Sequence, residues 1–316
     1  MKNYLNRITL LFTFTGLLAC TQPACADPLR VVSYNVENLF HPERDSLNPD
    51  REYTPDGARK WSYKRYYNKV ENIARVLTNI GEWEGVDIIG LQEIENAAVV
   101  KRLCYTLRRN EYDFVHYDSP DQRGIDVALI YKKSRIDTLQ TRVLPVRLAF
   151  ADHGGQETTR DILYVCAQAD GKDTLHLFVC HLPSQRGGKA ETEWKRIAAK
   201  SVLQTAVDSV MATNAQAKII VMGDMNSEPH EDITGLNNRM IQIPYGTHKF
   251  QGQWSCLDQF YTSSSLDSLT DVRIYNDGWI QETDDKFLGL KPKRTYNGYR
   301  YQNGYSDHLP IVLILK

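Results

Sequence analysis

Residues 219–226 read Ile219-Ile220-Val221-Met222-Gly223-Asp224-Met225-Asn226, four apolar residues and a glycine followed by a carboxylate and, two positions later, an amide. The apolar run predicts a buried strand, and its abrupt polar end marks the point where that strand leaves the sheet. Residues two apart on an extended chain point to the same side, so Asp224 and Asn226 should face one spot. Gly223 permits close approach of the backbone there. The segment indicates a buried sheet that presents polar groups at a strand end.

Similar apolar runs recur along the chain and alternate with amphipathic segments. Helical spacing predicts one helix that starts near Tyr63 and stops at Gly81, and another from about Ala190 to Met211. The residues expected to face the core from the second helix are Trp194, Ile197, Val202, Ala206 and Val210. Strands are expected at 29–34, 86–91, 127–131, 162–166, 175–180, 219–222, 259–261 and 310–315. Strands interleaved with helices, with no linker rich in Pro, Gly or Ser, predict one α/β domain.

The first 26 residues have the layout of a secretory signal peptide, so we expect residues 27–316 to form the exported domain. Lys2 and Arg7 precede an apolar run that is too short to span a membrane permanently. We therefore expect no transmembrane segment after processing, and a monomer that is periplasmic, secreted or held at the outer surface.

Two processing outcomes remain open. Ala24-Cys25-Ala26 fits the small-x-small rule for ordinary cleavage, whereas Leu17-Leu18-Ala19-Cys20 resembles a lipobox and would place a lipid anchor at Cys20. Cys20 and Cys25 both belong to this region. The remaining cysteines allow three disulfide pairings, among which the sequence does not choose: Cys104, Cys166, Cys180 and Cys256.

Composition and charge limit the classes of function. The 316-residue chain is 42% hydrophobic, which is enough for a large core. Its net charge of −1 becomes −3 once Lys2 and Arg7 are removed, since 36 basic residues then face 39 acidic ones. No overall positive field attracts nucleic acid, so contact with a polyanion requires a local basic patch.

Four further strand ends carry polar groups. Ser33-Tyr34-Asn35-Val36-Glu37-Asn38 follows the first expected strand, and Ile88-Ile89-Gly90-Leu91-Gln92-Glu93 ends in a carboxylate, the kind of oxygen ligand that Mg²⁺ prefers. A histidine, His181, ends the strand in Val179-Cys180-His181-Leu182-Pro183-Ser184. A second histidine, His308, follows an aspartate in Tyr305-Ser306-Asp307-His308-Leu309-Pro310. Histidine can act as acid, base or phosphate donor near neutral pH. With residues 219–226, these motifs form a set that can hold a metal and attack a phosphate.

In their order along the chain, these five motifs resemble those of the endonuclease/exonuclease/phosphatase family, over about residues 29–316. The resemblance implies a four-layer α/β sandwich in which two mixed β-sheets pack face to face and helices flank them. It also implies a divalent-metal-dependent phosphoesterase that uses Mg²⁺ or Mn²⁺ at one end of the sheets. Whether one metal ion or two would bind stays open.

The resemblance assigns roles to the residues at the strand ends. Asn35 and Glu93 would hold the metal, and Asp307 would lie beside it. Asp224 and Asn226 would orient the nucleophile and the transition state.

Further roles follow from the same resemblance. His308 would contact the phosphate or move a proton, and Asp258 would orient it, although Gln259 follows Asp258 where many relatives have Tyr or His. His181 matches the second catalytic histidine of the deoxyribonuclease-like and phosphodiesterase-like branches. Arg160 resembles an arginine that touches a substrate phosphate, and Asp126 is expected to orient His181; a surface salt bridge is the alternative for both.

We expect a nuclease that hydrolyses nucleic-acid phosphodiester bonds. The alternatives are a phosphatase or phosphodiesterase acting on inositol, lipid or small organic phosphates, and a surface-binding protein without activity, which the filled catalytic positions disfavour. Basic and aromatic residues mix at 60–67 and 291–301, and such clusters can contact phosphates and stack on unpaired bases. In the other interpretation, Tyr63 and Tyr67 pack inward and the charges only solvate a helix.

Overall fold

The computed structural model describes residues 27–43, 52–108, 110–149 and 156–316. The predicted signal peptide, with its cleavage site and Cys20, lies outside these residues. Over the described ranges, no helix combines the length and the apolar character needed to cross a membrane.

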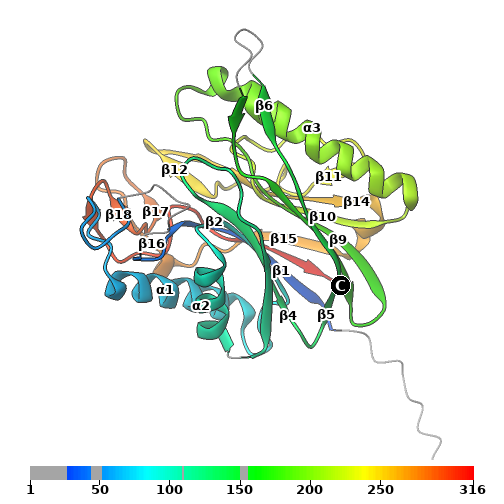
Figure 1. Ribbon diagram of the computed structural model, residues 1–316, viewed down its shortest axis with the longest axis horizontal. Coiled ribbons are helices and arrows are strands. Elements are labelled where there is room, and N and C mark those ends of the chain that lie inside the picture. Colours follow the sequence, from blue (N-terminus) through cyan, green and yellow to red (C-terminus); the bar gives the residue numbers. More distant parts are fainter. Residues whose placement is uncertain (1–26, 44–51, 109, 150–155) are drawn as a thin grey trace, which may run out of the picture.

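Two large sheets dominate the structure (Figure 1). The first has the strand order β15-β20-β1-β2-β4-β3 and the second β11-β14-β10-β9-β8-β5. The strands of the first sheet are β1 (Leu29–Leu39), β2 (Ile88–Ile94), β3 (Tyr112–His116), β4 (Asp126–Lys132), β15 (Thr270–Ile274) and β20 (Ile311–Leu315). Those of the second are β5 (Ile136–Leu144), β8 (Ile162–Ala169), β9 (Asp173–His181), β10 (Lys218–Asp224), β11 (Leu236–Asn238) and β14 (Asp258–Ser263).

The remaining elements are helices and short hairpins. The helices are α1 (Tyr63–Gly81), α2 (Ala97–Arg108) and α3 (Lys189–Thr213), with 3₁₀ turns η1 (Ser264–Leu269) and η2 (Gly278–Ile280). The hairpins pair β6 (Arg147–Ala149) with β7 (Gln156–Thr158), β12 (His248–Phe250) with β13 (Gln253–Ser255), β16 (Gln281–Thr283) with β17 (Leu290–Pro292), and β18 (Tyr296–Asn297) with β19 (Arg300–Tyr301).

The layers are those of the expected sandwich. Each sheet is mixed, because β1 and β2 run parallel, as do β9 and β10, while their other neighbours are antiparallel. Helices α1 and α2 cover the outer face of the first sheet and α3 covers the second (Figure 1). The sheets pack closely at Gly90, where an added Cβ would lie 2.6 Å from Met222 Sδ. The predicted four-layer α/β fold is confirmed.

Helix α1 begins and ends as predicted. Ser62 caps it by accepting a hydrogen bond from Arg65 N at 3.4 Å, and the helix ends at Gly81. Its buried face, however, includes Tyr66, whereas Tyr63 and Tyr67 are each 40% exposed. The alternative interpretation, in which Tyr63 and Tyr67 pack inward, is therefore wrong, because Tyr66 takes the buried position between them.

The inward face of α3 differs from the prediction at one position. Ala206 and Val210 are buried as expected, but Ile197 is 59% exposed. Arg196 takes the buried place beside it, because its guanidinium donates to the carbonyl of Pro183 before the helix and to Lys189 O and Thr192 Oγ1 in the first turn of α3. A pattern based on apolar residues does not reveal a buried arginine.

Every predicted strand is present, and the large-sheet strands that were not predicted lie at sheet edges. These are β3, β5, β11 and β15, each with a neighbour on one side only. Edge strands expose more of their surface and carry more polar residues, so their sequences lack a clear apolar run. The four cysteines that follow the signal region, Cys104, Cys166, Cys180 and Cys256, are all unpaired.

Candidate active site

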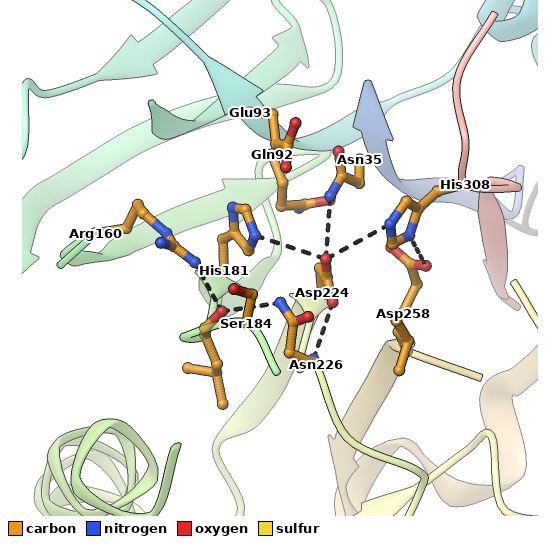
Figure 2. A network of polar contacts seen from close by, with 12 residues as sticks. Asn35, Gln92, Glu93, Arg160, His181, Ser184, Asp224, Asn226, Asp258 and His308 are labelled. Carbon is orange, nitrogen blue, oxygen red and sulfur yellow. Dashed lines mark hydrogen bonds and ion pairs between the residues drawn. The ribbon is translucent and has the colours of Figure 1, made fainter. Parts of the chain in front are cut away.

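Asp224 is the centre of the site, and the strand register places its partners. It ends β10 directly opposite His181 on β9 and Asp258 on β14. Its Oδ2 accepts a hydrogen bond from Asn35 Nδ2 at 3.0 Å. The same oxygen lies 3.6 Å from His181 Nε2 and 3.8 Å from His308 Nε2. Figure 2 shows the two histidines on opposite sides of this carboxylate.

The turn after β10 fixes the other oxygen of Asp224. Gly223 has a φ of 145°, and a Cβ there would lie 1.9 Å from the Cys180 carbonyl oxygen, so only glycine fits. Asn226 N donates to Asp224 Oδ1 at 2.9 Å, and Asn226 Nδ2 donates to Leu182 O at 3.0 Å. The structure thus brings Asp224 and Asn226 together, as predicted, and ties both to the segment after His181.

His308 is held by the expected carboxylate. Its Nδ1 lies 2.7 Å from Asp258 Oδ2, and Asp258 is fully buried. His308 N also donates to Ser306 Oγ at 3.1 Å. A further histidine, His248, lies against it with ring centroids 4.8 Å apart and was not predicted. Its signal in the sequence is weak, because β12 is only three residues long.

The two catalytic candidates prefer opposite charge states. Burial lowers the pKa of His181 well below its usual value, and Arg160 and Arg123 lower it further. Burial also opposes charge on His308, but Asp258 and its neighbouring acids raise the pKa of His308 well above the usual value. A neutral imidazole and an imidazolium thus flank the same carboxylate.

Burial also raises the pKa of Asp224, to about 7, in spite of the opposing charge of His308. Asp258 adds to the rise, whereas the hydrogen bonds from Asn226 N and Asn35 Nδ2 lower the pKa. A carboxyl that titrates near neutral pH can exchange a proton with a reacting group.

The residues expected to bind the metal come from the first sheet. Glu93 lies at the register shift of β2, with a φ of 65°, and its Oε2 accepts from Asn38 N at 2.8 Å. Asn35 Oδ1 accepts from Glu37 N at 3.0 Å, which leaves one of its two lone pairs available. Asp307 Oδ2 accepts from Arg294 at 2.6 Å.

This donor set fits Mg²⁺ or Mn²⁺. Glu93 and Asp307 supply carboxylates and Asn35 an amide oxygen, and Mg²⁺ typically uses one or two carboxylates and keeps several waters. Burial would raise the pKa of Asp307, but Arg294, His308, His248 and Lys69 lower it to about 2, so the group stays ionised.

A separate cluster of possible ligand atoms lies on the β3–β4 side. His116, Asp118 and Asp126 bring ligand atoms within 4.8 Å of one another. Asp126 accepts from Ser119 N at 2.9 Å and lies 3.2 Å from His116 Nε2. His181 Nδ1 has no hydrogen-bond partner among the described residues. The expectation that Asp126 orients His181 is therefore wrong, because the carboxylate oxygens of Asp126 contact Ser119 and His116 instead.

Arg160 lies beside His181, as Figure 2 shows. It donates to Asp121 Oδ2 at 3.0 Å and to Leu182 O at 2.8 Å, so an internal ion pair forms rather than a surface one. Its Nε is buried without a hydrogen-bond partner in the described structure. That free donor fits an oxygen of a bound phosphate.

A buried ionic network behind Asp307 was missed in the sequence. Lys69, on α1, donates to Thr295 Oγ1 and Tyr305 O at 2.5 Å and lies 3.9 Å from Glu37. Glu37 also accepts from Thr295 N at 2.6 Å and lies 3.4 Å from Arg294 Nε. Glu37 stands in the first motif, and Lys69 falls between Tyr66 and Ile73 on the buried helical face, so both had a detectable signal.

The aromatic residues of the basic clusters divide between the interior and the surface, where Tyr63 and Tyr67 are exposed. Trp61 is fully buried and donates to Phe40 O at 2.8 Å. Tyr296 is buried, and the Arg59 guanidinium lies 5.0 Å from its ring centroid and 5.1 Å from that of Tyr53. Tyr299 remains 64% exposed. These clusters offer fewer surfaces for base stacking than the sequence indicated.

Comparison with known proteins agrees with this geometry. The model of the Endonuclease/Exonuclease/phosphatase family matches residues 30–316. Solved structures with the same fold include a TDP2 from D. rerio humanized by 14 mutations, with 18% identity, 92% of this chain and 99% of that chain covered, and a TM-score of 0.55. None of the curated proteins matches the chain significantly.

Two other solved structures illustrate the range of this fold. The human Nocturnin catalytic domain with bound sulfate anion has 16% identity, coverage of 92% and 93%, and a TM-score of 0.55. The mannosyl-6-phosphatase of Bacteroides thetaiotaomicron has 17% identity, coverage of 91% and 100%, and a TM-score of 0.58. At these identities the likeness establishes the fold alone, and the family match carries the assignment. The chain belongs to the endonuclease/exonuclease/phosphatase family of metal-dependent phosphoester hydrolases.

Proposed function

We propose that this protein is an exported phosphodiesterase that uses Mg²⁺ or Mn²⁺ and hydrolyses nucleic-acid phosphodiester bonds. The observation that carries the proposal is the placement of His181 and His308 on opposite sides of Asp224, at 3.6 and 3.8 Å. A phosphodiester has a poor alkoxide leaving group, so its hydrolysis benefits from one group that takes a proton from water and another that gives one. Export rests on the sequence of residues 1–26 alone.

The surroundings of each histidine suit a different proton transfer. Asp258 at Nδ1 of His308 stabilises an imidazolium, which can donate to a leaving oxygen or to the phosphate. Within the described ranges no group bonds to Nδ1 of His181, and the ring can accept a proton through Nε2. Asp224, held by Asn35 and Asn226, positions the attacking water between them. A metal held by Glu93, Asn35 and Asp307 would stabilise the charge that develops on the phosphate oxygens.

Several cations could hold a nucleic-acid strand beyond the scissile phosphate. Arg160 offers its free Nε within the site. Arg186 is exposed on the segment between His181 and α3, and Lys189 is exposed at the first position of α3. Lys293 and Arg300 lie in the loop that precedes Asp307. Phosphate contacts on both sides of the reacting centre suit a polymer better than a small ester.

A second candidate is a hydrolase of small or lipid phosphate esters. A cleft of about 290 Å³ lies beside the segment that carries Asp258, with the side chains of Ile241, Tyr245 and Trp254 among its lining residues. It could take an apolar or ring-bearing alcohol instead of a polymer. The burial of Trp61 and Tyr296, which removes stacking surfaces, also favours this candidate.

Activity of purified residues 27–316 distinguishes the candidates. We expect cleavage of plasmid DNA, RNA or single-stranded oligonucleotides with Mg²⁺ or Mn²⁺, and none with chelator. Strong hydrolysis of an inositol or lipid phosphate with no cleavage of polynucleotides would replace the nuclease proposal with the second candidate.

A paired variant tests the strand contacts. Because Arg294 contacts Asp307, the informative substitutions in this loop are Lys293→Ala and Arg300→Ala. Together they should weaken DNA binding and flatten its salt dependence, because fewer phosphates are then contacted and fewer counterions are released on binding. Hydrolysis of a small generic diester should not change. An equal loss on both substrates would indicate damage to the site instead.

A further inference from the structure

Two arginines outside the five motifs contact the carboxylates expected to bind the metal. Arg123, in the loop between β3 and β4, lies 3.5 Å from Glu93 Oε1. Arg294, in the loop between β17 and β18, donates to Asp307 Oδ2 at 2.6 Å. Each expected carboxylate ligand thus has its own guanidinium partner.

Each arginine also has a second anchor that is not a metal ligand. Arg123 donates to Asn38 Oδ1 at 2.7 Å. Arg294 Nε lies 3.4 Å from Glu37 Oε1, and Glu37 is itself fixed by Thr295 N. If a cation took the place of the arginines at Glu93 and Asp307, these second anchors would keep both guanidiniums near the site with free N–H groups.

We propose that Arg123 and Arg294 form a phosphate clamp that metal binding releases. The divalent cation competes with the two guanidiniums for Glu93 and Asp307, and the freed N–H groups then bind oxygens of the substrate phosphate. This inference rests on the metal site of the proposed function.

The exposure of the side chains fits such an exchange. The side chains of Arg123 and Arg294 are 42% and 40% exposed, whereas those of Glu93 and Asp307 are 12% and 22% exposed. The carboxylates are therefore the fixed partners, and the arginines have room to move towards a ligand. The planar guanidinium matches phosphate oxygens in a bidentate contact.

Charge balance predicts the direction of each effect. A guanidinium beside a carboxylate repels an incoming Mn²⁺, so its removal should tighten metal binding. Removal also takes away a phosphate donor, so phosphate binding should weaken. Since coupling between two ligands is reciprocal, Mn²⁺ and phosphate should each tighten the other in the wild type, and less so in the variants.

Calorimetric titration of Mn²⁺, with and without inorganic phosphate, tests the clamp. We expect Arg123→Gln and Arg294→Gln to bind Mn²⁺ more tightly, on the order of 5-fold, the lower end of typical coupling. Both should lose most of the mutual tightening between Mn²⁺ and phosphate. Arg108→Gln is the matched control, because it removes a guanidinium that lies 3.4 Å from the carboxylate of Glu111, which is not an expected metal ligand, and it should behave as wild type.

The outcomes separate the clamp from the metal site. If Glu93→Gln binds Mn²⁺ as well as the wild type, the metal site of the proposed function is wrong. If Glu93→Gln loses Mn²⁺ but both arginine variants keep wild-type affinity and coupling, the site stands and the clamp is overturned. Should the Gln variants fail to fold, Arg123→Lys and Arg294→Lys keep the charge, and we expect normal Mn²⁺ affinity with weakened coupling; unchanged coupling in these variants would also overturn the clamp.

Discussion

The two sheets contribute to the site in different ways. The second sheet supplies His181, Asp224 and Asp258 from directly opposed positions on three neighbouring strands, and all three are buried. The first sheet supplies Glu93 from the register shift within β2 and Asp307 from the segment before β20, each with a half-exposed arginine beside it. Strand pairing fixes the residues of the second sheet, so they can position water and protons. Loop ion pairs hold the carboxylates of the first sheet, so these can exchange partners with a cation.

One substitution in each half gives the largest expected effect. Asp224→Asn and Glu93→Gln should each lower turnover on the order of 10³-fold, because each removes a charge at the reacting centre with little change in volume. Only Glu93→Gln should also lose Mn²⁺ binding, measured by calorimetry. Loss of Mn²⁺ affinity in Asp224→Asn would show that the halves do not divide the work in this way.

The same contrast explains what the sequence could predict. His181 and Asp224 end apolar strands and Asp258 begins one, and the resemblance to a family assigned all three to one site before the structure did. Arg123 and Arg294 come from loops without periodicity, and their partners depend on how the loops fold over the sheet edge.

Two sequence-based assignments failed for local reasons. Asp126 was expected to reach His181, but the loop that precedes it returns Ser119 to the same carboxylate. The phase of α3 was misjudged because Arg196 takes a buried position that apolar spacing would give to Ile197. In both cases a polar side chain forms hydrogen bonds with backbone or hydroxyl groups, and the spacing of apolar residues does not predict such bonds.

Replacing Lys69 should destabilise the part of the site that the first sheet and its loops supply. Lys69→Met keeps most of the volume but leaves Glu37 buried with less compensation, at a cost of about 3 kcal/mol. Urea unfolding measures this. The double variant Lys69→Met/Glu37→Gln, which removes both charges, should recover part of the loss. A single variant as stable as wild type would mean that Arg294 alone compensates Glu37.

The histidines test the half built from strands. His181→Ala and His308→Ala should each lower turnover by about 10²-fold, the usual size of general acid–base effects, with little change in Mn²⁺ affinity. Asp258→Asn should reproduce much of the His308 loss, because Asp258 orients that ring. A near-normal rate for either alanine variant would make that histidine structural.

The smallest expected effect concerns His248, which packs against His308 where the two halves meet. Burial lowers the pKa of His248 to about 4. The positive charges of His308 and Arg294 also lower this pKa, whereas Asp307 and Asp258 raise it. In the unfolded chain a histidine has a pKa of about 6.5, so between these values the unfolded state binds more protons.

The contribution of His248 to stability should therefore fall as the pH drops from about 6.5 to 4, by at most about 1.4 kcal/mol per pH unit, the value for one proton. His248→Gln removes the titrating group, so the free energy of unfolding, measured in urea across this range, should depend less steeply on pH. His181, whose pKa is also lowered, keeps its own contribution in both proteins. Equal slopes for the variant and the wild type would mean that His248 takes up its proton in the folded protein, and that the boundary between the two halves is more open to water than its packing indicates.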